Sequence, residues 1–309
     1  TFDTDSWVRT SPQVVDGTVY IGSIHDESVY ALDAETGQQV WRSSVGGNIV
    51  ASSPTVVDGT VYVGSEDTTV HALDAGTGEE VWAFDNEFEA GIESSPTVVD
   101  GTVYIGSQHN NVYALDAETG AEVWRFETGD SVYSSPTVAD GTVYVGGVDS
   151  NIYALDTASG EDVWTFETGN SIYASPTVAD GTVYVGSRDS NLYAVDAATG
   201  SEEWASTQLS GPMVSSPTVA DGVAYTGMIH GLRALDIETG ETMWAFETTV
   251  PFVDSSPTVV AGTVYFGSQD IADDIGRVYA VDAGVAGSSE DSRVNLGTLG
   301  HHHTWAGTD

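Results

Sequence analysis

Short runs of alternating apolar and polar residues return along most of the chain at a nearly constant interval. In residues 52–65, SSPTVVDGTVYVGS, such runs of Val, Thr and Tyr lie on either side of an Asp-Gly pair. Period-two alternation of β-branched and aromatic residues predicts two strands, and Asp-Gly predicts a tight hairpin because both residues tolerate positive φ angles. The proline cannot donate to a sheet ladder, so its strand is predicted to be innermost, with one unpaired edge.

The same phrase or a close variant stands seven times. Its prolines are Pro12, Pro54, Pro96, Pro136, Pro176, Pro217 and Pro257. Successive prolines are separated by 42, 42, 40, 40, 41 and 40 residues. A fixed period of about 20–50 residues marks an array of similar units rather than separate domains. We therefore expect residues 1–309 to form one domain of seven units.

Each unit continues with two further predicted strands, such as VHALD at 70–74 and EEVWAF at 79–84, joined by the turn DAGTG. Seven four-stranded antiparallel sheets bury their apolar faces against one another by radial closure, which leaves only short protected edges. The prediction is an all-β fold, a seven-bladed β-propeller. A right-handed β-solenoid is the alternative, although its repeats are usually nearer about 20–30 residues.

Six units place a tryptophan four residues beyond the glycine of the last turn, and these indoles are expected to dock against a neighbouring sheet: Trp41, Trp82, Trp124, Trp164, Trp204 and Trp244. The seventh unit lacks this residue. Residues 2–12, FDTDSWVRTSP, align instead with FETGDSVYSSP at 126–136, and TWAGTD at 304–309 offers Trp305 as a docking indole. We expect the N- and C-terminal segments to meet in blade seven and close the ring there.

The phrase ALDAETGAEVWRFETG at 114–129, with its relatives in the other units, resembles the tryptophan-docking repeat of the pyrroloquinoline quinone (PQQ) type propellers. The resemblance covers almost the whole chain. It implies a non-catalytic scaffold or binding propeller, outside the cytoplasm or at the cell surface, of the kind that includes the lipoprotein assisting outer-membrane protein assembly. The alternative that it implies is a PQQ-dependent quinoprotein dehydrogenase-like oxidoreductase, with PQQ and calcium as cofactors.

The sequence favours the non-catalytic branch. Many of the dehydrogenases carry adjacent cysteines beside the cofactor and insertions that cap the active site, whereas this chain has no cysteine and is much shorter. No GxSxG, Walker or HExxH motif occurs, so hydrolase and nucleotide-dependent functions have no support. We expect no catalytic residue and no cofactor.

The charge of the chain bears on its expected environment and on its expected partners. The chain has 47 acidic and 7 basic residues, a formal net charge of −40. Molar salt shortens the Debye length to about 3 Å and screens such repulsion, so the composition predicts a protein of an extreme halophile. The alternative is a polyanionic surface for a basic partner or polyvalent cations.

Charge and hydropathy also exclude classes of partner. Nucleic acid is excluded because its phosphates are bound through Lys and Arg, and no run of about 18 apolar residues offers a membrane span. The expected partner is a protein or a small molecule, and the expected state is a monomer.

The units differ from one another at the position three residues before the proline. Four residues before each proline stands an apolar residue, predicted to lie in the core: Val8, Val50, Ile92, Val132, Ile172, Met213 and Val253. The next residue points the other way, toward the axis, and is Arg9, Ala51, Glu93, Tyr133, Tyr173, Val214 or Asp254. Because two units accept Ala or Val there, the blade does not require the polar residues, which are therefore available for recognition.

These residues form the candidate ligand-binding site at the channel mouth, with two flanking aromatic residues: Trp7, Arg9, Glu93, Tyr133, Tyr173, Phe252 and Asp254. Arg9 is its expected anchor for a carboxylate or phosphate. The alternative is that Arg9 pairs with Asp254 across the seam between blades one and seven, while the tyrosines line a water-filled channel.

Metal-binding candidates are few. Asp270, Asp273 and Asp274 offer carboxylates to a hard cation such as calcium, although their spacing is not that of an EF-hand. His25, His109 and His230 fall in turns of non-adjacent units and are expected to be solvated. The consecutive residues 301–303, all histidine, fit either a weak transition-ion site or an exposed terminal segment.

Overall fold

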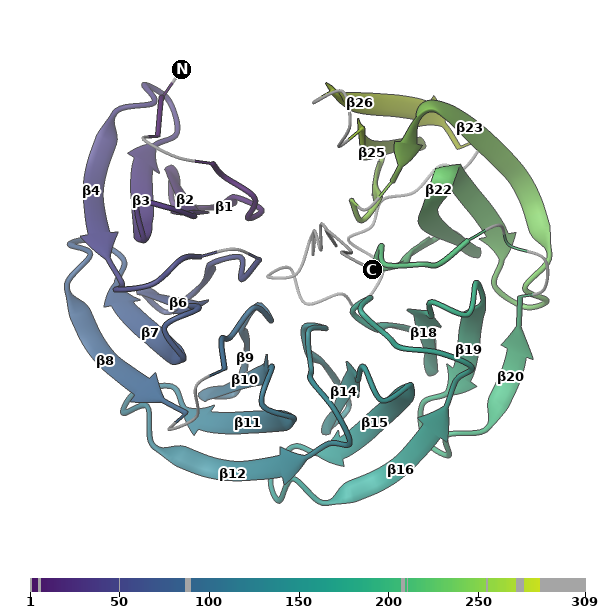
Figure 1. Ribbon diagram of the computed structural model, residues 1–309, viewed down its shortest axis with the longest axis horizontal. Coiled ribbons are helices and arrows are strands. Elements are labelled where there is room, and N and C mark those ends of the chain that lie inside the picture. Colours follow the sequence, from purple (N-terminus) through teal and green to yellow (C-terminus); the bar gives the residue numbers. More distant parts are fainter. Residues whose placement is uncertain are drawn as a thin grey trace.

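The computed structural model describes residues 2–4, 7–49, 51–86, 90–206, 209, 211–253, 255–270 and 275–283. Over this part of the chain it contains strands and turns and no helix, and hence no helix suited to crossing a membrane. The sheets follow one another around a ring in chain order, as Figure 1 shows. The predicted all-β, seven-bladed propeller is confirmed.

Blades 1 to 5 each contain four antiparallel strands that pair in chain order. They are β1–β4 (Gln13–Val15, Thr18–Ser23, Ser28–Asp33, Gln39–Ser44), β5–β8 (Thr55–Val57, Thr60–Gly64, Thr69–Asp74, Glu80–Asp85), β9–β12 (Thr97–Val99, Thr102–Ser107, Asn111–Asp116, Glu122–Glu127), β13–β16 (Thr137–Ala139, Thr142–Gly146, Asn151–Asp156, Asp162–Glu167) and β17–β20 (Thr177–Ala179, Thr182–Gly186, Leu192–Asp196, Glu202–Ala205).

Blades 6 and 7 depart from this pattern. Blade 6 consists of β21 (Thr218–Ala220), β22 (Val223–Asp236) and β23 (Thr242–Phe252), where the long β22 takes the place of the second and third strands. Blade 7 consists of β24 (Thr258–Val260), β25 (Thr263–Asp270) and β26 (Ile275–Asp282). The pair Phe252–Gln269 joins β23 to β25, so the two blades share one six-stranded sheet.

The first hairpin of each blade forms as its sequence predicts. Asp58 and Gly59 have φ angles of 49° and 78°, the two positive values of a two-residue hairpin turn. In blade 7 the first turn residue is Ala261, with φ 49°, which is a strained value for alanine. The strand that begins directly after the proline lies at the edge of each four-stranded sheet, as predicted.

The repeated SSPT phrase joins one blade to the next around the axis. In blade 2 the Ser53 amide donates to Ser95 Oγ at 2.8 Å, and Thr55 Oγ1 donates to the Pro96 carbonyl at 2.6 Å, both in blade 3. The preceding Ser52 Oγ accepts the Gly64 amide of its own blade at 2.8 Å. Hydroxyls of the phrase therefore satisfy backbone groups that the short edge strand leaves unpaired.

The indoles make a second connection between blades at the outer radius. Trp124 is 7% exposed, and its Nε1 donates to the Thr157 carbonyl of blade 4 at 2.9 Å. Its ring lies against Gly160, where an added Cβ would come within 2.6 Å of Trp124 Cδ2. The same bond to the next blade is made by Trp41 to Ala75, Trp82 to Ala117, Trp164 to Ala197 and Trp204 to Ile237.

The seam between blades 7 and 1 is partly described. Phe2 packs edge-on against Tyr30 of blade 1 at 5.5 Å between centroids, as Phe126 of blade 3 packs against Tyr153 of blade 4 at 5.3 Å. Phe2 thus stands where the last strand of a preceding blade places its phenylalanine. Trp305 and the rest of the C-terminal segment lie outside the described residues.

One prediction about the core entry positions is wrong, and one falls on a residue that the structure does not describe. Val8 is 39% exposed and is therefore not a core residue. In blade 2 Ile49 is fully buried against Gly22, and the neighbouring Val50, predicted for the core, lies outside the described residues. The remaining five residues of this set are at most 1% exposed.

Candidate functional site

The centre of the ring is lined by the segments that lead into each first strand (Figure 1). In blades 1 to 5 each of these segments bonds to the turn between the second and third strands of its own blade. The amide of Val148 donates to the Ser131 carbonyl at 2.9 Å, and that of Arg188 donates to the Ser171 carbonyl at 3.0 Å. This pairing brings the entry residue of each blade, such as Tyr133 or Tyr173, close to its turn.

An acidic group lies on the blade 3 side of this mouth. Glu93 is half-buried, and its Oε1 accepts a hydrogen bond from Gln108 Nε2. Burial, and then the charge of Glu66, raise the pKa of Glu93 to about 7. Glu66 in turn accepts a bond of 2.7 Å from Asn48 Nδ2. Glu93 is therefore a carboxyl group poised to gain or lose a proton near neutral pH.

An aromatic group continues from the acidic one into blades 4 and 5. The rings of Tyr133 and Tyr173 stack with centroids 5.3 Å apart and planes at 24°. The Arg188 guanidinium carbon lies 5.4 Å from the centre of the Tyr173 ring, within the range of a cation–π contact. Burial, and then the charge of Glu93, raise the pKa of Tyr133 to about 12, so its hydroxyl stays protonated at neutral pH.

Arg9 contacts an aromatic residue of its own segment. Its guanidinium carbon lies 5.6 Å from the Trp7 ring centre, and Trp7 is 64% exposed, with its ring 5.8 Å from that of His25. These contacts put Arg9 on blade 1, whereas Tyr133 and Tyr173 lead into blades 4 and 5 across the ring (Figure 1). The described contacts thus bring Glu93 together with the two tyrosines and place Arg9 beside Trp7.

Several predicted site residues lie outside the described part of the chain. These are Asp254, Asp273, Asp274 and the three consecutive histidines 301–303. Phe252 and Asp270 end β23 and β25, and their side chains are also outside it.

Sequence comparison missed the turn residues that complete the mouth. The first residue of the second turn is Ile24, Glu66, Gln108, Val148 or Arg188 in blades 1 to 5, and the matching residue of blade 6, Ile229, lies within the long strand β22. The residue at this position differs between the units as much as the residue at the entry position does. Comparing the units at this turn would therefore identify it.

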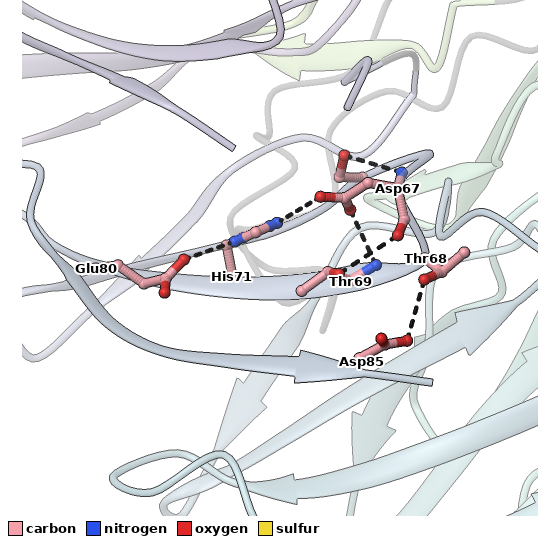
Figure 2. A network of polar contacts seen from close by, with 7 residues as sticks. Asp67, Thr68, Thr69, His71, Glu80 and Asp85 are labelled. Carbon is pink, nitrogen blue, oxygen red and sulfur yellow. Dashed lines mark hydrogen bonds and ion pairs between the residues drawn. The ribbon is translucent and has the colours of Figure 1, made fainter. Parts of the chain in front are cut away.

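A second polar network lies in blade 2, where His71 takes the position of a tyrosine in blades 1, 3, 4 and 5 (Figure 2). His71 is 6% exposed, its Nδ1 lies 3.1 Å from Glu80 Oε2, and its Nε2 lies 3.3 Å from Asp67 Oδ2. Burial favours the neutral ring, but the bonds to Asp67 and Glu80 outweigh it, so the pKa of His71 is raised. In blade 5 Tyr193 bonds to the matching Asp189 at 2.6 Å. The histidine therefore replaces a structural tyrosine.

Comparison with known proteins identifies the repeat. A family model described as outer membrane protein assembly factor BamB matches residues 3–89, 66–174 and 148–284. No curated protein matches the chain.

Solved structures share the fold at low identity. The crystal structure of BamB from Moraxella catarrhalis is 23% identical, with a TM-score of 0.77 over 90% of this chain and 84% of that one. The quinohemoprotein alcohol dehydrogenase ADHIIG from Pseudomonas putida HK5 is 20% identical, with a TM-score of 0.72 over 93% of this chain and 66% of that one. The computationally designed protein Ika8 is 16% identical, with a TM-score of 0.60 over 89% and 96%.

Proposed function

The chain belongs to the repeat family described as outer membrane protein assembly factor BamB, and from that premise we propose that it is a non-catalytic binding or scaffold propeller. Its binding face is the channel mouth, where Glu93, Tyr133 and Tyr173 gather. The observation that carries the proposal is the stack of Tyr133 on Tyr173 with Arg188 over the second ring. These side chains come from positions that other blades fill with alanine, valine or isoleucine, so recognition rather than the fold explains them.

The charge of the mouth selects the partner. The chain carries a formal charge of −40. The Glu93 carboxyl lies near Tyr133, and Glu66 lies near Glu93. Aromatic faces and carboxylates both attract ammonium and guanidinium groups. The partner is a protein segment that presents a lysine or arginine next to an aromatic residue. A cation beside Glu93 favours its charged form and lowers its pKa from about 7, so binding at pH 7 releases protons.

A quinone centre with calcium fits these residues poorly. Calcium takes about six to eight oxygen ligands. In the described part of the chain no three His, Cys, Asp or Glu side chains are grouped to hold a metal ion, and the Glu93 carboxyl accepts a hydrogen bond from Gln108 Nε2. We therefore propose no dehydrogenase activity. Asp270, Asp273 and Asp274 stay a sequence prediction of a cation site.

The proposed protein acts outside the cytoplasm in a medium of high salt. The family description, which names outer-membrane assembly, supports a site of action outside the cytoplasm. The charge of −40 supports a medium of high salt.

The test uses the peptide acetyl-Lys-Trp-Lys-amide as probe. We expect saturable binding by calorimetry at pH 7 in molar KCl, with proton release measured as a difference between two buffers of unequal ionisation heat. Glu93→Gln is expected to abolish the proton release and weaken binding. Tyr173→Val, which introduces the residue that blade 6 has at Val214, is expected to weaken binding.

Arg9→Ala is the matched control at the same repeat position and is expected to bind the peptide like the parent protein. Absence of binding, or full binding by both the Glu93→Gln and the Tyr173→Val variants, would refute the mouth as the binding face. Loss of binding in Arg9→Ala alone would return the anchor to Arg9.

A further inference from the structure

Blade 3 contains a surface cavity that the proposed function does not use. Its volume is about 360 Å³, and it is lined by His109, Asn110, Asn111, Arg125 and Glu127. The first three residues belong to the turn between β10 and β11 or to the start of β11, and the last two lie on the outer strand β12. The volume suits a small ligand. The lining consists of polar side chains, which suits a ligand with few apolar atoms.

The sheet register sets the spacing of the charged groups. Asn111 lies opposite Glu127, and Tyr113 lies opposite Arg125. Arg125 and Glu127 are two residues apart on one strand, so their side chains leave the same face with Cα atoms about 6.5–7 Å apart. The turn is fixed by Asn111 Nδ2, which donates to the His109 carbonyl at 2.6 Å. The cavity therefore places one cation and one anion side by side on a rigid wall.

Comparison between blades shows why this arginine is exposed to a ligand. The turn position of His109 holds aspartate in blades 1, 2, 4 and 5. In blade 1 that aspartate, Asp26, lies 3.5 Å from Arg42, the counterpart of Arg125. Because blade 3 has His109 at this turn position, Arg125 has no aspartate at that position with which to pair.

The remaining ion pair of Arg125 is weak. Its Nε lies 3.8 Å from Glu122 Oε1, and the two side chains are 55% and 36% exposed. An exposed pair of this kind contributes little and yields readily to a bidentate ligand.

The two charged groups of the cavity decide the class of ligand. Arg125 attracts an anionic group and repels a cation, whereas Glu127 attracts a cationic group and repels an anion. A zwitterion has no net charge and avoids both costs. We propose that this cavity binds a small zwitterion such as a free α-amino acid. Its carboxylate bonds to the Arg125 guanidinium and its ammonium to the Glu127 carboxylate, with Asn110 and Asn111 at its sides.

Glycine is the probe, and each half of its charge supplies a comparison. Calorimetric titration is expected to show saturable binding of glycine, with acetate and methylammonium each at least about tenfold weaker because each satisfies one charged group and leaves the other unpaired.

Three variants use residues that other blades carry at the same positions, so the blade accepts them: His109→Asp, Arg125→Ala and Glu127→Ser. Each is expected to weaken glycine binding at least about tenfold, His109→Asp because the new carboxylate pairs with Arg125 as Asp26 pairs with Arg42. Arg42→Ala in blade 1 is the control and is expected to leave glycine binding unchanged.

Each contrary result rejects the assignment. Equal binding of acetate and glycine would make the cavity an anion site, and equal binding of methylammonium would make it a cation site. A dissociation constant for glycine above about 100 mM, or unchanged affinity in all three variants with thermal unfolding like the parent, would mean that the cavity has no such ligand.

Discussion

Gly160 gives the sharpest test of how the blades hold together. The glycine has a φ of +70°, and a Cβ built on it would lie 2.6 Å from Cδ2 and 2.7 Å from Cε3 of Trp124 in the preceding blade. Gly160→Ala therefore incurs two costs. The left-handed backbone costs about 1–2 kcal/mol for alanine, and the overpacking against the indole costs about 1–3 kcal/mol more.

Gly141 is the matched control, because it has a φ of +80° in the same blade and nothing within 4 Å of an added Cβ. Gly141→Ala is expected to incur the backbone cost alone, about 1–2 kcal/mol. Trp124→Ala removes a buried indole that is 7% exposed and is expected to cost about 3–5 kcal/mol. In its background Gly160→Ala should cost no more than Gly141→Ala does.

Urea unfolding at constant molar KCl, followed by circular dichroism and by tryptophan fluorescence, measures these free energies where the two transitions coincide. The double-mutant cycle between positions 124 and 160 is expected to give a coupling of about 1–3 kcal/mol. Equal costs for Gly160→Ala and Gly141→Ala, or a cost at position 160 that persists without the indole, would refute the reasoning.

Three further predictions concern pH, salt and a turn. The pKa of His71 is raised in the folded protein, so its stabilisation is present below the ordinary histidine pKa and is lost as pH rises through the folded value. The parent should therefore lose stability relative to the His71→Tyr variant, which carries the residue of blades 1, 3, 4 and 5, as the pH rises above about 6.5. A pH-independent difference in urea unfolding would contradict this. Lowering KCl from about 1 M to 0.1 M lengthens the Debye length from about 3 to 10 Å, so the melting temperature should fall; an unchanged value would refute the halophile interpretation. Ala261 has a φ of 49° where other blades have aspartate, so Ala261→Asn should stabilise the fold by about 0.5–1 kcal/mol, and a loss of stability would show that the turn has another requirement.

The repeats allowed the turns and strands of each blade to be predicted. They did not allow the packing at the seam between blades 7 and 1 to be predicted. The Asp-Gly turns and the edge position of the proline strand follow from neighbours in the chain and were predicted correctly. The exposure of Val8 was not, because the position looks like its six counterparts in sequence and differs in the blade that lies beside it.

The sequence alone determined the period, the strand positions, the turn geometry and the seven-bladed ring, because alternation and φ preference act between residues a few positions apart. Tertiary structure decided which variable residues meet. Glu93, Tyr133, Tyr173 and Arg188 are drawn from three blades, and their contacts depend on the rotation from each blade to the next. That rotation is set by packing between residues about one repeat apart in the sequence, such as Trp124 on Gly160. For the same reason Arg9, alike in sequence position, lies with Trp7 across the ring.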